Sequence, residues 1–202
     1  MRPVLRLVIL FAVFVLSAGA VACADDGEPS GAEAPEASGG AVEAPTEIVG
    51  GDTFLRLDPG LERVLDAAGV AVEPAGAAEA TARGIRFPIS AGSVDIDTLS
   101  GELEHEGGLR FSALGRSLQA TDFVIRPGDD VLTADIEGRR LPLLSLDFGR
   151  PRVIETSDTV VLPATAGTLA DDAVQELNDR LGIDAFEGGL RLGRVTSSAQ
   201  RP

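Results

Sequence analysis

Few side chains in this sequence could do chemistry, and one histidine stands out among them. His105 is the only histidine and Cys23 the only cysteine in 202 residues. A Ser-His-Asp triad would have to use His105, but no serine lies in the G-x-S-x-G context of a nucleophile elbow. One histidine and one cysteine are also too few for a zinc site. The residues therefore predict no metal site and no enzyme.

The position of His105 leaves two interpretations open. It shares one face of a predicted strand with Leu99 and Leu103, and the turn residues Gly107 and Gly108 follow it. In the first interpretation it is a partly buried residue whose ring nitrogens bond to the backbone near the hairpin. In the second it contacts a ligand at the rim of the domain, with Gly107 and Gly108 beside it.

Acidic pairs occur without a recognised metal-binding pattern. Asp95-Asp97 and Asp129-Asp130 offer carboxylates for calcium, but neither pair has the ligand spacing of an EF-hand loop. Two carboxylates could also serve a wall-degrading hydrolase, which would need a cleft that holds them at a fixed separation. Pairs of acids are common on an acidic chain, so neither use is predicted from them.

The overall charge bears on the partners. The chain has 17 basic residues, all arginine, and 32 acidic residues, for a formal net charge of −15. A negative surface repels nucleic-acid phosphates and anionic headgroups, and binding to either needs a basic footprint. Nucleic acid is therefore excluded as a predicted partner.

The N-terminus indicates export. Residues 1–22 have the order of a secretory signal peptide: Arg2 and Arg6, an apolar run from Leu7 to Leu16, and then small residues. Cys23 follows directly and resembles the acylated cysteine of a lipobox, although the same site also suits ordinary secretion. A diacylglycerol on Cys23 would anchor the chain at the outer face of the cytoplasmic membrane or cell envelope.

Residues 23–51 are predicted to be a tether and residues 52–202 a single extracytoplasmic domain. The tether is rich in Ala, Gly, Pro, Glu and Ser and carries seven acids without a basic residue. It has too little apolar surface to fold, and coil statistics give it a reach of about 30 Å.

Caps and periodicity predict two short amphipathic helices. The first spans about 59–68, with Asp58 as N-cap, Gly69 after its end and a stripe that includes Val64. The second spans about 169–181, with capping-box spacing from Thr168 and Gly182 after its end.

The rest of the domain alternates apolar and polar residues with short turns between the runs, which favours an antiparallel sheet. We therefore predict a mainly β fold, an antiparallel β-sandwich or open barrel with the two helices. A change of phase between Leu118 and Ile125 predicts a β-bulge near Thr121-Asp122. The alternating runs centre on residues 85–89, 99–105, 109–113, 132–136, 144–148 and 190–194.

Several of these runs resemble the HtaA-like domains of exported haem-uptake proteins from high-GC Gram-positive bacteria. The similar segments are 101–109, 122–125 and 131–136, while the segment 87–92 resembles a broader set of uncharacterised actinobacterial lipoproteins. The resemblance implies a β-rich domain that binds haem through an axial tyrosine supported by a histidine. His105 matches the histidine, whereas this chain contains no tyrosine.

The sequence thus favours an envelope-anchored lipoprotein whose domain is a non-catalytic binding or interaction module for an unidentified envelope protein or small ligand. The alternative is haem or small hydrophobic ligand binding centred on His105.

Overall fold

The computed structural model describes residues 44–148 and 153–202, and within them strands dominate. The helices are α1 (Pro59–Ala68) and α2 (Asp171–Leu181), with a short 3-10 helix, η1, at Pro127–Asp129. The strands are β1 (Thr46–Ile48), β2 (Gly50–Leu57), β3 (Ala71–Ala75), β4 (Glu79–Thr81), β5 (Gly84–Val94), β6 (Gly101–His105), β7 (Gly108–Ala113), β8 (Arg116–Arg126), β9 (Val131–Ile136), β10 (Arg139–Asp147), β11 (Ile154–Glu155), β12 (Thr159–Leu169) and β13 (Arg191–Gln200).

Eight antiparallel strands close into a barrel in the order β5-β2-β13-β12-β10-β9-β8-β6. Closure depends on β6, which pairs with β5 on one side and with β8 on the other. The predicted mainly β class is therefore confirmed, and the barrel is closed rather than open. Closure removes the exposed edges that an open sheet of this size would leave unpaired.

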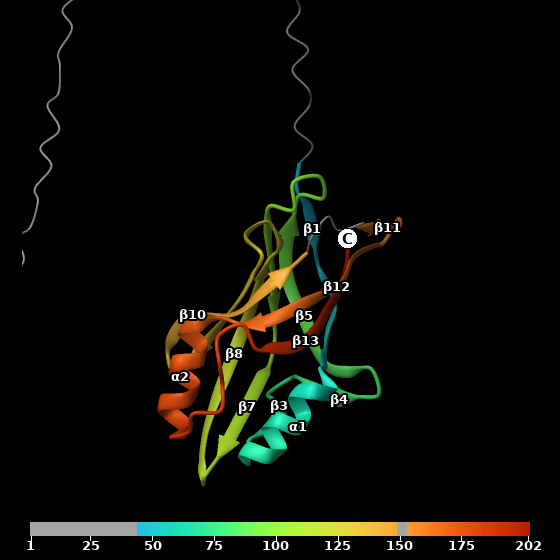
Figure 1. Ribbon diagram of the computed structural model, residues 1–202. Coiled ribbons are helices and arrows are strands. Elements are labelled where there is room, and N and C mark those ends of the chain that lie inside the picture. The colour runs from blue at the N-terminus through green and yellow to red at the C-terminus, as the bar shows by residue number, and fades with distance from the viewer. Residues whose placement is uncertain (1–43, 149–152) are drawn as a thin grey trace, which may run out of the picture. The chain divides into compact units, whose positions relative to one another are not determined.

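The remaining strands extend the barrel wall. β1 and β4 pair with β5, β11 pairs with β12, and β7 and β3 continue outward from β8. Figure 1 shows the β7–β8 hairpin projecting from the barrel towards the helices. α2 contacts β7, β8 and β10, whereas α1 contacts β13.

The predicted bulge lies in β8. The register of β8 against β9 shifts between Thr121 and Val124, and Asp122 has a φ of 52°. Thr121 donates its hydroxyl hydrogen bond to the Asp122 carboxylate, and Arg140 donates to the Asp122 carbonyl. The extra residue returns the apolar side chains on either side to the same face, as the change of phase in the sequence requires.

α1 has the predicted bounds. Asp58 accepts a hydrogen bond from the Gly60 amide at 2.8 Å, and Gly69 ends the helix with a φ of 67°. Leu61 and Leu65 are buried as expected, but Val64 is 46% exposed, so its assignment to the core was wrong.

α2 begins two residues later than predicted. Leu169 is the last residue of β12, and Thr168 is paired with Ser145 and Arg191 in the sheet. The N-cap is Ala170, which has no side-chain cap, so the predicted capping box was wrong. Strand pairing outweighs a local capping preference here.

The folded domain also starts earlier than expected. β1 and the first residues of β2, Gly50 and Gly51, are strands in a region that we assigned to the tether. Ile48 is 3% exposed, so this segment contributes to the core. The predicted signal peptide and Cys23 lie outside the described residues.

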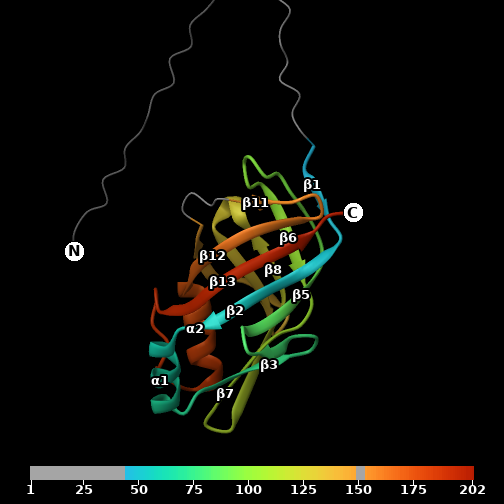
Figure 2. The same cartoon turned by 90° about the vertical axis from the view of Figure 1, so that its right-hand side faces the viewer.

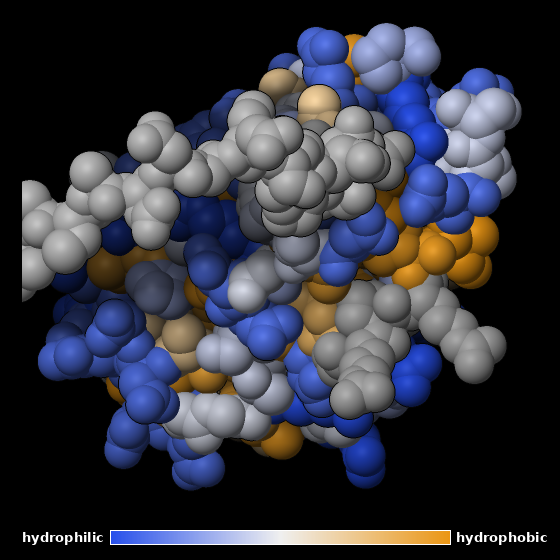
Figure 3. Space-filling view, turned by 90° about the horizontal axis from the view of Figure 1, so that it is seen from above, coloured by the Kyte–Doolittle hydropathy of each residue, from blue (hydrophilic) through white to orange (hydrophobic). Residues whose placement is uncertain are grey.

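One apolar core fills the barrel and the space beneath the helices. Phe87 and Phe123 pack with ring centroids 5.1 Å apart, and Phe111 meets Phe186 edge to face at 6.1 Å. No helix in 44–148 or 153–202 is long and apolar enough to span a membrane. From above, the domain presents mostly hydrophilic side chains with apolar patches between them (Figure 3).

Candidate functional site

His105 is the last residue of β6, and its side chain enters the barrel wall where β6 and β8 part. Only two residue pairs join these strands, Leu103 with Ile125 and Glu104 with Val124. We call this short contact the β6–β8 seam. Beyond these two pairs, the ring of His105 connects β6 to β8. The residue is 5% exposed. His105 is buried, as the first interpretation expects, but only one of its two ring nitrogens bonds to the backbone and the other bonds to a side chain.

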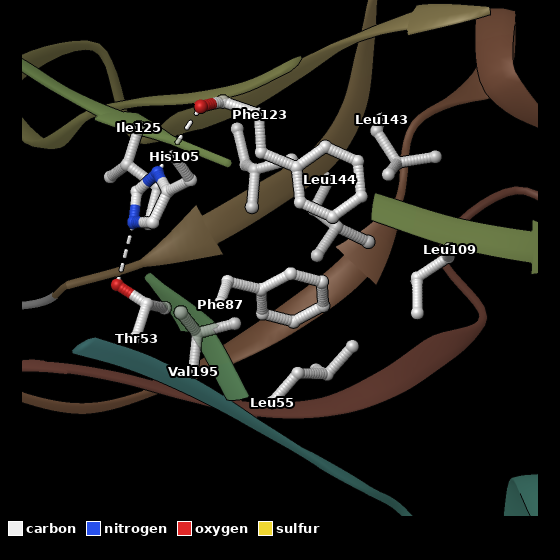
Figure 4. A pocket seen from close by; sticks show the side chains of 11 residues that line it. Thr53, Leu55, Phe87, His105, Leu109, Phe123, Ile125, Leu143, Leu144 and Val195 are labelled. Carbon is white, nitrogen blue, oxygen red and sulfur yellow. Dashed lines mark hydrogen bonds between the residues drawn. The ribbon is translucent and has the colours of Figure 1, made fainter. Parts of the chain in front are cut away.

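Both ring nitrogens have partners (Figure 4). Nδ1 lies 3.1 Å from the Phe123 carbonyl, and Nε2 lies 2.7 Å from the Thr53 hydroxyl, which is 2.8 Å from the Ser197 hydroxyl. A carbonyl only accepts, so Nδ1 of the neutral ring must carry the hydrogen. Nε2 then accepts from Thr53, and Ser197 donates to Thr53. Four strands, β2, β6, β8 and β13, meet in this chain of hydrogen bonds.

The imidazole is held in its neutral form. Burial lowers the pKa of His105 from 6.5 to about 4, and the hydrogen bonds with the backbone of Phe123 and Leu103 oppose this shift only in part. Removal from water penalises the charged ring, and the partners of the two ring nitrogens are a hydroxyl and a carbonyl rather than a carboxylate. Because Nδ1 bonds a backbone carbonyl rather than an acid, the Ser197-Thr53-His105 chain is not a catalytic triad.

Inside the seam, the barrel is filled by apolar side chains. The cavity that His105 and Thr53 border has a volume of about 10 Å³. That space holds at most about one water molecule. The apolar residues around it, shown in Figure 4, are Leu55, Phe87, Leu109, Phe123, Ile125, Leu132, Leu143, Leu144 and Val195.

Outside the seam lies a more polar pocket of about 440 Å³. Glu104, Glu106, Asp122 and Arg140 border it, and His105 forms part of its floor. His105 thus stands in the wall between an open pocket and the apolar interior, so the second interpretation of the sequence, contact with a ligand, stays a hypothesis.

The two predicted site glycines lie beside His105 and have close backbone neighbours. Gly107 has a φ of 81° and borders the outer pocket. A Cβ atom on Gly108 would lie 2.0 Å from the Ala120 carbonyl oxygen. Close approach of the backbone explains both glycines without a ligand.

The acidic pairs fold into turns. The Asp95 carboxylate accepts hydrogen bonds from the backbone amides of Asp97 and Thr98, and the bonds with Thr98 lower its pKa. Asp129 ends η1 and Asp130 follows in the left-handed region. Within 44–148 and 153–202, no three His, Cys, Asp or Glu side chains gather closely enough to hold a metal ion.

Sequence reasoning missed Thr53 and Ser197. A signal was present: each is a hydroxyl residue at an inward position of an alternating run, between apolar neighbours such as Leu55 and Val195. Buried hydroxyls need hydrogen-bond partners, so such residues point to a polar contact inside the barrel. Which partner they meet depends on the strand order.

Comparison with solved structures shows that this fold is similar to the fold of the HtaA domains. The chain is similar to the C-terminal domain of HtaA from Corynebacterium glutamicum, with a TM-score of 0.59 and 14% identity over 78% of this chain and 99% of that one. It is also similar to the N-terminal domain of that HtaA, with a TM-score of 0.51 and 13% identity over 77% and 98% of the two chains. The heme binding protein HtaB from the same organism gives a TM-score of 0.51 and 12% identity over 78% and 96%.

The HtaA-like resemblance predicted from the sequence is therefore confirmed at the level of fold. Searches of protein families and of curated proteins gave no match.

The closed barrel does not fit a bound haem. An imidazole and an apolar wall suit haem, but Nε2 is already bonded to Thr53 and the interior leaves about 10 Å³. Ligand pockets measure roughly 300–1,000 Å³. The resemblance implies a tyrosine beside the histidine. In this chain the hydroxyl beside His105 belongs to Thr53, and an aliphatic alcohol lacks the acidity of a phenol.

Proposed function

We propose that this chain is an exported, non-enzymatic binding protein whose ligand is a small apolar molecule taken up beside His105, with haem as the first ligand to test. The observation that carries the proposal is the shared fold: nearly the whole length of two HtaA domains and of HtaB, described as a heme binding protein, superposes on this domain. Fold alone does not assign a ligand, so the site residues must be tested directly.

The β6–β8 seam is the route by which the ligand would enter the barrel. Because two residue pairs are all that join β6 to β8, their separation breaks fewer ladder hydrogen bonds than parting β12 from β13, which are joined by eight residue pairs. Separation would bring His105, Phe87 and Phe123 to the surface together. A ligand that binds only this open form shifts the population towards it, and the shift is larger the more tightly the ligand binds.

Export and anchoring belong to the same proposal. A lipid on Cys23 would place the domain at the envelope, with the membrane as its partner through that lipid. The test is incorporation of radiolabelled palmitate in cells, which Cys23→Ser should abolish. Release of unlabelled protein into the medium by the unaltered chain would contradict anchoring.

The ligand is tested by haem titration, followed by absorbance. The protein is the chain from Cys23 onward with Cys23→Ser, and it is compared with His105→Ala and His105→Gln variants. We expect a saturable one-to-one shift of the Soret band that both variants lose while keeping their circular dichroism. A flat titration, or a shift indifferent to His105, overturns the proposal.

A disulfide across the seam supplies the control for opening. Glu104→Cys with Val124→Cys places two cysteines at directly opposite positions, where Cα atoms lie about 4.5–5.5 Å apart and a disulfide is feasible. The oxidised protein should lose haem binding and the reduced protein should recover it. Equal binding in both forms would show that the ligand does not enter through the seam.

A further inference from the structure

The outer side of the barrel wall carries three arginines that meet in one groove. Arg56 comes from β2, Arg83 from the turn between β4 and β5, and Arg194 from β13. All three are exposed, and none forms an ion pair within 44–148 and 153–202. The arginines that do form ion pairs there are Arg86, Arg126, Arg139, Arg180, Arg191 and Arg201.

Two of the three face each other directly. Arg56 and Arg194 are opposite partners in the antiparallel ladder between β2 and β13. Like charges at opposite positions destabilise a strand pair. From residue 52 onward the chain has 25 acids and 15 arginines, so carboxylates are plentiful. Two neighbouring arginines that form no ion pair within the described part of such an acidic domain indicate a binding site for an anion that is not part of the chain.

The groove also has an apolar floor and hydroxyl groups. It measures about 460 Å³, and Phe54 and Val161 line it with Thr196 and Ser198. The Arg83 guanidinium lies 4.1 Å from the ring centroid of Phe54. The volume falls in the range of small-ligand sites. Figure 2 shows the strands that form the groove, β2, β13 and β12, side by side on the face towards the viewer.

We propose that this outer groove binds a carboxylate or phosphate group carried on an apolar or planar body. Guanidinium groups bind such oxyanions through paired, charge-assisted hydrogen bonds. Arg56 and Arg194 would hold the oxyanion between them and so relieve their mutual repulsion, while Phe54 and Val161 would contact the body. The Thr196 and Ser198 hydroxyls add donors at the edge.

This site is separate from the one proposed beside His105. Thr53 points into the barrel towards His105, and the next residue, Phe54, points out into the groove. The groove can therefore bind its ligand whether or not haem binds inside, and failure of one proposal leaves the other standing.

The test uses phenyl phosphate, a soluble aromatic oxyanion, followed by amide NMR shifts of the chain from Cys23 with Cys23→Ser. We expect saturable binding with a dissociation constant of about 1 mM or below. Arg56→Gln and Arg194→Gln should each weaken it about tenfold or more. Without ligand, each variant should raise the Tm by about 1–3 °C, because it removes the like-charge pair.

Arg110→Gln is the matched control, since Arg110 is an exposed strand arginine outside the groove with no ion pair among the described residues. Sedimentation with phosphatidylcholine vesicles that contain phosphatidylglycerol separates the two sources of the oxyanion. Vesicle binding that the same two variants abolish assigns it to a lipid headgroup, and binding of phenyl phosphate alone assigns it to a soluble ligand. The proposal is overturned if neither binds, or if Arg110→Gln weakens binding as much as Arg56→Gln.

Discussion

Nε2 of His105 lies 2.7 Å from the hydroxyl of Thr53, 52 positions earlier in the chain. The contact joins β6 to β2 past β5, the strand that pairs with both, and the Phe123 carbonyl of β8 holds the other ring nitrogen. The single histidine is thus fixed beside the β6–β8 seam, the shortest strand pairing in the barrel. A ligand that enters at the seam has to compete with these two hydrogen bonds.

The buried imidazole should make stability depend on pH. The pKa of His105 is lowered from 6.5 to about 4, so between these values the unfolded chain binds a proton that the native state does not. The stability that the neutral His105 contributes is therefore fully present above about pH 6.5 and is lost as the pH falls towards 4. We expect a loss of about 2 kcal/mol between pH 7.5 and pH 5.

Urea unfolding at both pH values measures this loss, and His105→Gln is the control for the carboxylates that titrate in the same range. The difference between wild type and variant should change with pH as stated. An NMR titration that shows His105 protonating near pH 6.5 in the native protein would contradict the prediction.

The Thr53 hydroxyl and the His105 imidazole should be energetically coupled, so that the costs of removing them do not add. Thr53→Val keeps the shape of the side chain but leaves Nε2 of His105 without a partner, for an expected cost of about 1–3 kcal/mol in the free energy of unfolding. In a Thr53→Val, His105→Leu double variant, no buried imidazole remains unsatisfied. Its cost should fall below the sum of the two single variants by denaturant unfolding, and strict additivity would show that the contact is not coupled.

The β8 bulge should tolerate glycine and resist a β-branched residue. Asp122 has a φ of 52°, which glycine adopts freely and valine does not. Asp122→Val should lose about 1–2 kcal/mol in thermal unfolding, whereas Asp122→Gly should stay close to wild type. Both variants lose the hydrogen bond from Thr121, so the difference between them isolates the backbone conformation. Equal losses would place the effect in the side chain.

Asn178, the only asparagine, should hold the segment after α2. Its amide nitrogen donates to the Phe186 carbonyl at 2.8 Å, and its oxygen accepts from the backbone amides of Ala185 and Phe186. Asn178→Ala removes all three bonds and should cost about 1–3 kcal/mol. It should also loosen the contact between Phe186 and Phe111, visible in the ring resonances.

Asn178→Asp is the control for that prediction. A carboxylate still accepts from the two amides but cannot donate to the Phe186 carbonyl. Its loss in urea unfolding should be smaller than that of Asn178→Ala. An aspartate variant as unstable as the alanine variant would assign the effect to the donated bond alone.

Local patterns in the sequence determined much of the secondary structure. The bounds of α1 follow from Asp58, Pro59 and Gly69, whose preferences act within a few residues. The bulge at Asp122 follows from a change of phase in an alternating run. Even the burial of His105 follows from its place on an apolar strand face. Each of these depends on neighbours in the chain, so the printed residues suffice to predict it.

Other features depended on contacts between residues far apart in the sequence. Thr168 looked like a helix cap, but pairing with β10 and β13 keeps it in β12. Closure of the barrel depends on β6 meeting both β5 and β8, which no local pattern encodes.

The partners of His105 and the opposed pair Arg56 and Arg194 arise in the same way, since strand order alone brings them together. The sequence by itself determined which residues face inward and where the chain turns. Only the tertiary structure decided which inward and outward residues meet, because the order of strands in a barrel is set by packing of the whole core.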